Sequence, residues 1–381
     1  MMVPDDAAAM RQALACARSV EGRTSPRPPV GAVVVRDGEV IGQGATAPPY
    51  GPHAEVFALR EAGERARGAT LYVTLEPCCI TRHTPPCTEA VIAAGIRRVV
   101  VAICDPNPHV CEQGIAQLRA AGIEVTVGVG EEEAREIIQP FLSYISKGRP
   151  YVTAKWAMTL DGKLATRTGD SRWISGPRSR LRVHQLRDRV DAILVGAGTL
   201  RQDDPQLTVR LPEKLRGKPR QGPLRVVISA SGDVPQQSRL FSSELAEGTC
   251  LIVGEGSERR ELLQRLRERG VSVLAAPLDA RNQVDLDAAL RLLAQEKDCM
   301  HVLLEGGSHL LGSALDCRLV DHVQVFIAPK VVGGSTASSP VAGVGLALMS
   351  DAFQLQHMYT EIVEHDMLIE GDIYYGPGNG N

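Results

Sequence analysis

The chain has 381 residues, of which 44% are hydrophobic and 23% are charged, and its formal net charge is −3. This length exceeds what one hydrophobic core usually supports, so we expect two domains. The weak, slightly acidic charge argues against a protein that binds duplex nucleic acid.

The first part of the chain predicts alternating helices and strands. Helical spacing of apolar residues, or a high content of alanine and glutamate, predicts helices at 7–20, 54–67, 87–94 and 113–121. Apolar runs predict strands at 30–35, 69–75, 98–103 and 123–127. Asp37-Gly38 predicts a hairpin turn into a further strand from Val40. This alternation predicts an α/β domain with a largely parallel sheet.

A polar segment rich in helix breakers, Lys147-Gly148-Arg149-Pro150, separates this domain from the next. We therefore place the domains at 1–146 and 147–381. The pattern then restarts, with helices predicted at 178–189 and 286–294. Strands are predicted at 151–155, 191–195, 224–228, 249–253, 271–275, 301–304 and 322–327. The second domain is thus also expected to be α/β.

The termini and cysteines indicate the compartment. The segment that begins at Met1 has no basic stretch followed by an apolar one, so no signal peptide is expected, and no apolar run approaches a membrane span. The nine cysteines are odd in number and irregularly spaced, unlike a disulfide framework. We expect a cytoplasmic protein whose clustered cysteines serve metal binding or catalysis.

Three motifs in the first domain together indicate a catalytic zinc site. His53 and Glu55 form an H-x-E motif. Cys78 directly follows Pro77 at the end of a predicted strand, and Cys87 comes nine positions later. One histidine and two cysteines leave the fourth position of a tetrahedral zinc ion open, which is typical of catalytic sites. Glu55 is expected to transfer protons, so the motifs predict hydrolytic removal of an amine from a nitrogen heterocycle.

Other interpretations of these residues stay open at this point. Single cysteines and histidines are usually buried or surface groups without a ligand. Cys79 stands beside Cys78, and either thiol can reach a metal, although the position after Pro77 favours Cys78. A structural zinc ion in a nucleotide-binding or regulatory protein is a third interpretation, disfavoured because structural sites normally use four protein ligands.

The second domain contains two glycine-rich loops after predicted strands. Gly196-Ala197-Gly198 follows one strand, and Glu305-Gly306-Gly307 follows another. Backbone amides in such loops can bind a phosphate. Arg201 stands where a Rossmann fingerprint has its third glycine, so a plain strand-to-helix turn is an equally good interpretation of the first loop.

Longer segments around these motifs resemble the bifunctional deaminase–reductase family of riboflavin biosynthesis. The resemblance covers nearly the whole chain and rests on 52–55, 72–78, 84–87, 105–108, 159–163, 173–175, 203–205 and 305–307. It implies a cytidine-deaminase-like α/β/α domain followed by a dihydrofolate-reductase-like α/β domain. It also implies a homo-oligomer that acts on a small molecule.

The resemblance implies two reactions. The first is zinc-dependent deamination of 2,5-diamino-6-(5-phosphoribosylamino)pyrimidin-4-one. The second is reduction of the ribosyl group to ribityl by NADPH, with Asp203 as the catalytic carboxylate. The substrate-binding residues that it implies are Lys155, Arg187, Leu207, Arg210, Glu305, Asp105 and Asn107. The cofactor-binding residues that it implies are Thr159, Asp161, Trp173, Ser175, Gly196, Thr199, Gly306 and Gly307.

The first domain departs from its family at positions that read the substrate. Arg27 replaces an asparagine, Thr46 and Phe57 replace histidines, and residues 80–83 also differ from the usual pattern. Arg27, Arg82 and His83 can hold a phosphate or can be solvated loop residues. The alternative function is therefore that of a paralogue with an altered deaminase pocket, which acts on a related aminated heterocycle in a specialised pathway.

Overall fold

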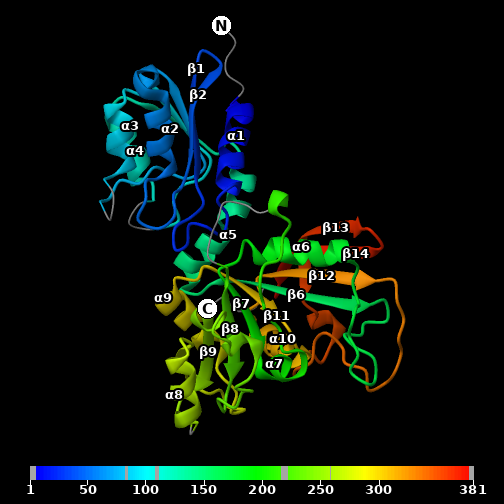
Figure 1. The fold of residues 1–381 in the computed structure, drawn as a ribbon. Coiled ribbons are helices and arrows are strands. Elements are labelled where there is room, and N and C mark those ends of the chain that lie inside the picture. The colour runs from blue at the N-terminus through cyan, green and yellow to red at the C-terminus, as the bar shows by residue number, and fades with distance from the viewer. Residues whose placement is uncertain (1–5, 82–84, 108–110, 216–221, 258, 377–381) are drawn as a thin grey trace. The chain divides into compact units, whose positions relative to one another are not determined.

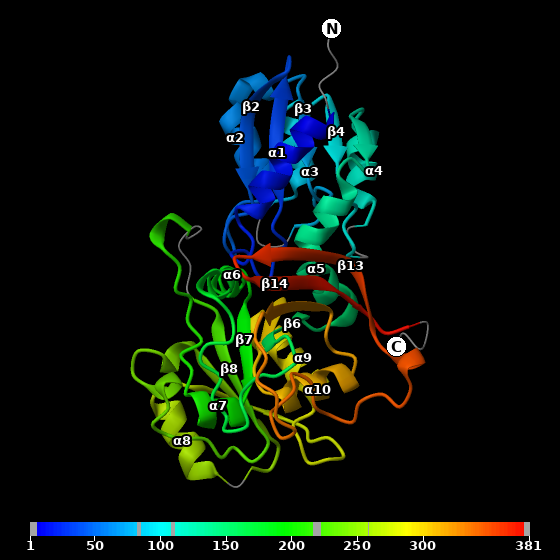
Figure 2. The same ribbon diagram turned by 90° about the vertical axis from the view of Figure 1, so that its right-hand side faces the viewer.

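A computed structural model describes residues 6–81, 85–107, 111–215, 222–257 and 259–376. The chain forms two compact units and passes from the first to the second between Gly148 and Arg149. Each unit is built on one sheet with helices on both faces (Figures 1 and 2). In the part of the chain described here, no helix is both long and apolar enough to span a membrane.

The first unit contains a five-stranded sheet in the order β2-β1-β3-β4-β5. Its strands are β1 (Gly31–Arg36), β2 (Glu39–Ala45), β3 (Thr70–Val73), β4 (Arg98–Val101) and β5 (Glu124–Val127). Its helices are α1 (Asp6–Arg18), α2 (Ala54–Ala62), α3 (Cys87–Ala93), α4 (Gln113–Ala120) and α5 (Glu131–Lys147). Helices α1 and α5 cover one face, and α2, α3 and α4 cover the other (Figure 2).

The prediction of a largely parallel sheet holds only for β3, β4 and β5. Strand β1 pairs antiparallel with both β2 and β3. The predicted hairpin turn explains the pairing with β2, because Asp37 and Gly38 both have positive φ and turn β2 back along β1. The helix predicted at 54–67 also ends early, because Gly63 adopts a left-handed φ of 54° and a short 3₁₀ segment follows.

The second unit contains a nine-stranded sheet in the order β10-β9-β8-β7-β11-β6-β12-β14-β13. Its strands are β6 (Tyr151–Thr159), β7 (Ala192–Gly196), β8 (Leu224–Ser229), β9 (Thr249–Gly254), β10 (Ser272–Ala276), β11 (His301–Glu305), β12 (His322–Ala328), β13 (Gln354–Val363) and β14 (Asp366–Tyr374). Its helices are α6 (Pro177–Arg187), α7 (Ala197–Asp203), α8 (Arg260–Glu268), α9 (Leu286–Lys297) and α10 (Ser308–Asp316). All strands from β10 to β12 run parallel, and β14 and β13 then add an antiparallel hairpin.

Alternating residues of the central strands fill two cores in this unit. Ala192 and Leu194 of β7 belong to the core under α9 and α10, whereas Ile193 and Val195 belong to the core under α7 and α8. Both faces are apolar because a parallel sheet is covered on both sides.

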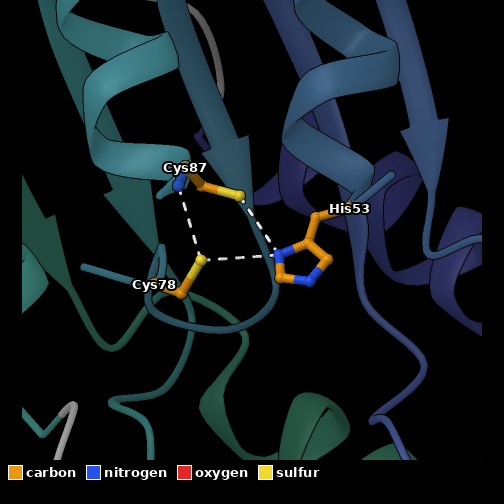
Figure 3. A group of neighbouring side chains, drawn as sticks. All are labelled: His53, Cys78 and Cys87. Carbon is orange, nitrogen blue, oxygen red and sulfur yellow. Dashed lines mark hydrogen bonds between the residues drawn. The ribbon is translucent and has the colours of Figure 1, made fainter. Parts of the chain in front are cut away.

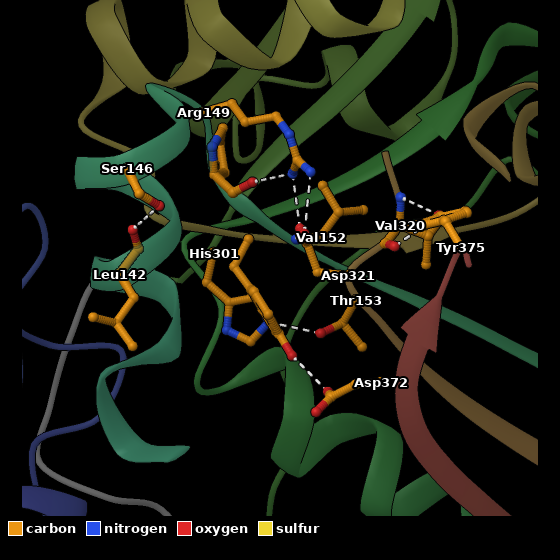
Figure 4. Close-up of polar contacts among 12 residues, drawn as sticks. Leu142, Ser146, Arg149, Val152, Thr153, His301, Val320, Asp321, Asp372 and Tyr375 are labelled. Carbon is orange, nitrogen blue, oxygen red and sulfur yellow. Dashed lines mark hydrogen bonds and ion pairs between the residues drawn. The ribbon is translucent and has the colours of Figure 1, made fainter. Parts of the chain in front are cut away.

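A buried ion pair ties the first residue of the second unit to the sheet. Arg149 donates from Nη1 and Nη2 to the two carboxylate oxygens of Asp321, at 2.7 and 3.1 Å (Figure 4). Asp321 also accepts a hydrogen bond from the backbone N–H of Val152 at the start of β6. Both side chains of the pair are less than a tenth exposed, so solvent hardly screens the interaction.

Replacing Asp321 with alanine is expected to lower the free energy of unfolding of this unit by about 3 kcal/mol or more, because the Arg149 charge stays buried after its carboxylate is lost. Both tryptophans of the chain, Trp156 and Trp173, lie in this unit, so tryptophan fluorescence during urea unfolding reports its stability selectively. Asp287→Ala, which removes an exposed pair with Arg291, is the control and should cost about 0.5 kcal/mol or less. Equal effects of the two substitutions would contradict this account of the buried pair.

Candidate active sites

The predicted zinc ligands come together in the first unit. His53 caps the amino terminus of α2, Cys78 lies in the segment after β3, and Cys87 is the first residue of α3. Nδ1 of His53 lies 3.2 Å from Sγ of Cys87 and 3.5 Å from Sγ of Cys78 (Figure 3). Among the described residues, these three form the one group suited to hold a metal ion, and Cys79 is not part of it.

The donor set and spacing fit zinc. Tetrahedral ligation with bonds of about 2.3 Å to sulfur and about 2.1 Å to nitrogen separates those two atoms by about 3.6 Å. A hydrogen bond from Cys87, helped by His53, lowers the pKa of Cys78 to about 4 although burial opposes this. The same hydrogen bond and burial raise the pKa of Cys87. Metal ligands bind as thiolates, so loading a cation releases thiol protons from this pair.

Glu55 is placed beside these ligands without belonging to them. It lies in the first turn of α2 and is only 3% exposed. Burial raises the pKa of its carboxyl to about 7, and the neighbouring Cys78 thiolate adds to the shift while His53 opposes it. A carboxyl with this pKa exchanges protons readily near neutral pH, as a general acid and base must.

A second buried carboxylate, Glu76, was not among the residues that the sequence singled out. Its Oε2 accepts hydrogen bonds from the backbone N–H groups of Asp105 at 3.1 Å and Glu112 at 3.0 Å, and its Oε1 accepts one from Ile115 at 3.2 Å. It therefore caps the amino terminus of α4 from a distant segment. We call this set of contacts the Glu76 clamp.

The clamp links the zinc loop to the predicted substrate loop. Glu76 stands two residues before Cys78, and it holds the backbone of Asp105, whose Oδ1 accepts the N–H of Asn107 at 2.8 Å. Asp105 and Asn107 are both 8% exposed. Gly114 permits the close approach, since a Cβ there would lie 2.1 Å from the carbonyl oxygen of Pro77.

The positions at which the first domain departs from its family differ in their surroundings. The Thr46 hydroxyl is buried and accepts the N–H of Val30 at 3.0 Å, so it serves the backbone. Phe57 lies on α2 and is 37% exposed. Arg27 is half-buried and donates to the carbonyl of Gly51. Arg82 and His83 lie outside the described residues.

In the second unit, three predicted substrate residues form one buried charged cluster. Nε and Nη2 of Arg187, on α6, each donate to a Glu305 oxygen at 2.6 Å, in a bidentate pair. Lys155 of β6 stands directly opposite Glu305 of β11 in the sheet. Burial alone raises the pKa of Glu305, but the charge and hydrogen bonds of Arg187 hold it below its ordinary value. Burial lowers the pKa of Lys155, opposed by Glu305.

The segment 207–210 passes beside this cluster. Nη1 of Arg187 donates to the carbonyl of Thr208 at 3.0 Å, and the N–H of Arg210 donates to Nδ1 of His184 at 3.2 Å. Burial and the charges of Arg187 and Arg210 lower the pKa of His184 to about 4, so the imidazole is neutral and can accept. Leu207 is buried, whereas the side chain of Arg210 is exposed.

Asp203, the predicted catalytic carboxylate of the second domain, is the last residue of α7. Partial burial raises the pKa of its carboxyl, and the positive charge of Arg172 opposes this. A raised pKa makes a carboxyl a better proton donor near neutral pH.

The two glycine-rich loops lie side by side because their strands, β7 and β11, are neighbours in the sheet. The hydroxyl oxygen of Thr199 accepts the N–H of Gly307 at 3.0 Å. Gly306 has a φ of 135°, and a Cβ there would lie 3.0 Å from the same hydroxyl oxygen. Gly196 ends β7 and precedes α7. Four predicted cofactor residues are thus brought together.

The other four predicted cofactor residues form a second group around the loop after β12. Oγ1 of Thr159 donates to Asp161 at 2.6 Å, and Asp161 accepts the N–H of Gly333 at 2.8 Å. The Trp173 ring is 64% exposed and packs on the guanidinium of Arg180, 4.5 Å from the ring centroid. Arg180 also donates to the carbonyl of Ser175.

These two units define a class of protein, a zinc-dependent deaminase joined to a nucleotide-dependent reductase. Residues 3–103 match the cytidine and deoxycytidylate deaminase zinc-binding region, and residues 150–368 match the RibD C-terminal domain. The chain is 43% identical to the riboflavin biosynthesis protein RibD of Aquifex aeolicus, over 94% of this chain and 96% of that protein. It is 38% identical to RibD of Escherichia coli, over 91% and 94% of the two chains.

Solved structures agree over the whole length. Acinetobacter baumannii RibD matches with a TM-score of 0.86 and 34% identity, over 97% of this chain and 99% of that one. A Thermotoga maritima deaminase/reductase matches with a TM-score of 0.81 and 36% identity, over the same shares of the two chains. The chain belongs to the RibD family of bifunctional deaminase–reductases in riboflavin biosynthesis.

This membership confirms the predicted fold class, with a cytidine-deaminase-like domain followed by the RibD reductase domain. It also confirms the two enzymatic activities and the cofactors zinc and NADPH. The comparisons favour riboflavin biosynthesis over the alternative of a paralogue in a specialised pathway.

Replacing Glu76 with glutamine is expected to lower deaminase kcat/KM by about 10-fold or more. The amide nitrogen takes the place of one carboxylate oxygen, so a backbone N–H that donated to that oxygen is left without an acceptor. Zinc content and reductase activity should not change, and the reductase serves as an internal control in the same chain. Glu112→Gln makes the same chemical change on an exposed side chain of the clamped segment and should have little effect. Equal activities of both variants and the wild type would show that the clamp does not position the substrate loop.

Proposed function

We propose that this chain deaminates 2,5-diamino-6-(5-phosphoribosylamino)pyrimidin-4-one and then reduces the ribosyl group of the product to ribityl. The observation that carries this is the convergence of His53, Cys78 and Cys87 beside the buried Glu55. The same chain also has the charged pair of Arg187 and Glu305 in its second unit. The Thermotoga maritima relative is described as a diaminohydroxyphosphoribosylaminopyrimidine deaminase and 5-amino-6-(5-phosphoribosylamino)uracil reductase.

In the deaminase, His53, Cys78 and Cys87 would hold the zinc ion, which would supply an activated water as the nucleophile near neutral pH. Glu55 would take up the proton of that water and pass protons to the ring nitrogen and to the leaving amine. Its pKa of about 7 suits both directions of transfer. Asp105 and Asn107 bind the substrate from the clamped loop.

In the reductase, Lys155, Arg187, Leu207, Arg210 and Glu305 bind the phosphoribosyl substrate. NADPH supplies the hydride that reduces C1 of the sugar. Asp203 assists the proton transfer that accompanies opening of the ribose ring, and its raised pKa supports this role.

Two groups of residues form the proposed NADPH site. One group lies at the glycine-rich loops, and the other lies around the loop after β12. Gly306 has a φ of 135°, which side-chain-bearing residues rarely adopt, and lets the backbone of this loop approach a phosphate closely. The N–H of Gly307 already donates to the Thr199 hydroxyl and holds the loop in place. The residues assigned to it are Gly196, Thr199, Gly306, Gly307, Thr159, Asp161, Trp173 and Ser175.

We further propose that residues 1–146 act as the deaminase domain and 147–381 as the reductase domain. A cytoplasmic location, a homo-oligomeric assembly and the absence of nucleic-acid partners complete the proposal. The irregular, odd set of cysteines supports the location, and the weak net charge of −3 supports the absence of nucleic-acid partners. The homo-oligomer rests on the resemblance to the family. A structural zinc ion is disfavoured, because only three protein ligands gather among the described residues.

Replacing Glu55 with glutamine is expected to lower the deaminase kcat by about 100-fold or more, because the amide cannot carry the proton. The assay uses zinc-loaded protein and the diaminopyrimidine substrate without NADPH. Glu89→Gln, an exposed carboxyl in the first turn of α3, is the matched control and should keep full activity. A zinc-loaded wild-type protein that fails to turn over this compound would refute the proposed substrate.

Replacing Asp203 with asparagine is expected to lower the reductase kcat by about 100-fold, with little change in KM for NADPH, because the proton donor is lost and the cofactor loops are intact. Supplying the deaminated intermediate directly isolates the second reaction. Deaminase activity in the same preparation checks that the chain is folded. A variant with normal reductase kcat would remove Asp203 from the mechanism.

A further inference from the structure

Arg27 is held in a fixed position by the backbone around it. Its N–H donates to the carbonyl of Thr24 at 2.8 Å, and the Thr24 hydroxyl donates to the carbonyl of Arg27 at 2.8 Å. Prolines at 26, 28 and 29 restrict the same segment. The side chain therefore starts from a well-defined turn.

One end of the Arg27 guanidinium is fixed as well, and the other lacks a partner. Nη1 donates to the carbonyl of Gly51 at 2.8 Å, two residues before the metal ligand His53. Nη2 is buried and has no hydrogen-bond partner among the described residues. Burial lowers the pKa of this arginine, and the negative charge of Cys78 opposes the shift. The hydrogen bond to Gly51 places the guanidinium close in sequence to the metal ligand His53.

A buried donor of this kind calls for an acceptor that the described residues do not supply. A guanidinium nitrogen donates hydrogen bonds and cannot accept them, and buried polar atoms in folded proteins are nearly always paired. Arg23, four residues earlier, differs because it donates to the carbonyl of Glu21 and is not among the buried side chains without a partner. The two arginines of this loop therefore differ in whether the described residues satisfy their donors.

We propose that Arg27 determines substrate specificity in the deaminase by donating a hydrogen bond from Nη2 to the carbonyl oxygen of the pyrimidinone ring. This inference rests on the proposed function. In the proposed substrate, a single ring nitrogen separates that carbonyl carbon from the carbon that loses its amine. A guanidinium anchored on Gly51, two residues before the ligand His53, is thus suited to reach the carbonyl while the amine-bearing carbon faces the metal site. A charged donor strengthens such a bond in a buried site.

The phosphate of the substrate offers the same acceptor chemistry, so the test compares two substrates. One is the phosphoribosyl compound and the other is its dephosphorylated nucleoside. Arg27→Ala is expected to lower deaminase kcat/KM by about 10- to 100-fold, and by the same factor on both compounds. Arg27→Lys keeps the positive charge but lacks the forked donor, and should lose a similar factor.

Arg23→Ala is the matched control in the same loop and should change kcat/KM by less than about 2-fold. Zinc content and reductase activity of each variant check that both units are folded. Unchanged kinetics of Arg27→Ala would overturn the assignment. A loss confined to the phosphorylated compound would show that Arg27 binds the phosphate instead of the ring carbonyl, and would overturn it too. A zinc-loaded wild type without deaminase activity would refute the proposed function itself, and this inference with it.

Discussion

In both units, neighbouring parallel strands end at the same edge of the sheet, and the segments that follow them carry the chemistry. Strands β3 and β4 pair in parallel, so the segment with Cys78 and the segment with Asp105 emerge side by side. Strands β7 and β11 do the same for Gly196 and Gly306. Residues far apart in the chain meet there because the strand pairing decides which loops are adjacent.

Buried charge at these edges is satisfied in two different ways. Glu76 accepts hydrogen bonds from three backbone N–H groups, and these bonds orient a loop and cap a helix. Glu305 instead faces Arg187 in a bidentate ion pair. The first arrangement fixes backbone, and the second keeps a charged surface available to a polar substrate. The difference suits the roles proposed for the two sites, a rigid loop in one unit and the binding of a charged substrate in the other.

Local spacing explains how far the sequence predicted these sites. His53 and Glu55 are two residues apart at the start of one helix, so their proximity could be read directly. The Glu76 clamp could not, because its partners are 29 to 39 residues away and are backbone groups without a residue signature. The sequence pattern also did not predict the C-terminal hairpin of β13 and β14. Much of β13 is exposed, so it lacks the alternation of apolar and polar residues that marks a half-buried strand.

The departures from the family pattern show why a residue's type alone does not reveal its role. Thr46 carries a polar group, yet its hydroxyl serves the backbone of Val30 and is not free for a ligand. Arg27 also carries a polar group, but its anchored guanidinium leaves one nitrogen buried without a partner among the described residues. The family pattern gives no reason to treat the two substitutions differently. Their hydrogen bonds do, because they separate a substitution that serves the backbone from one that offers a donor to the proposed substrate.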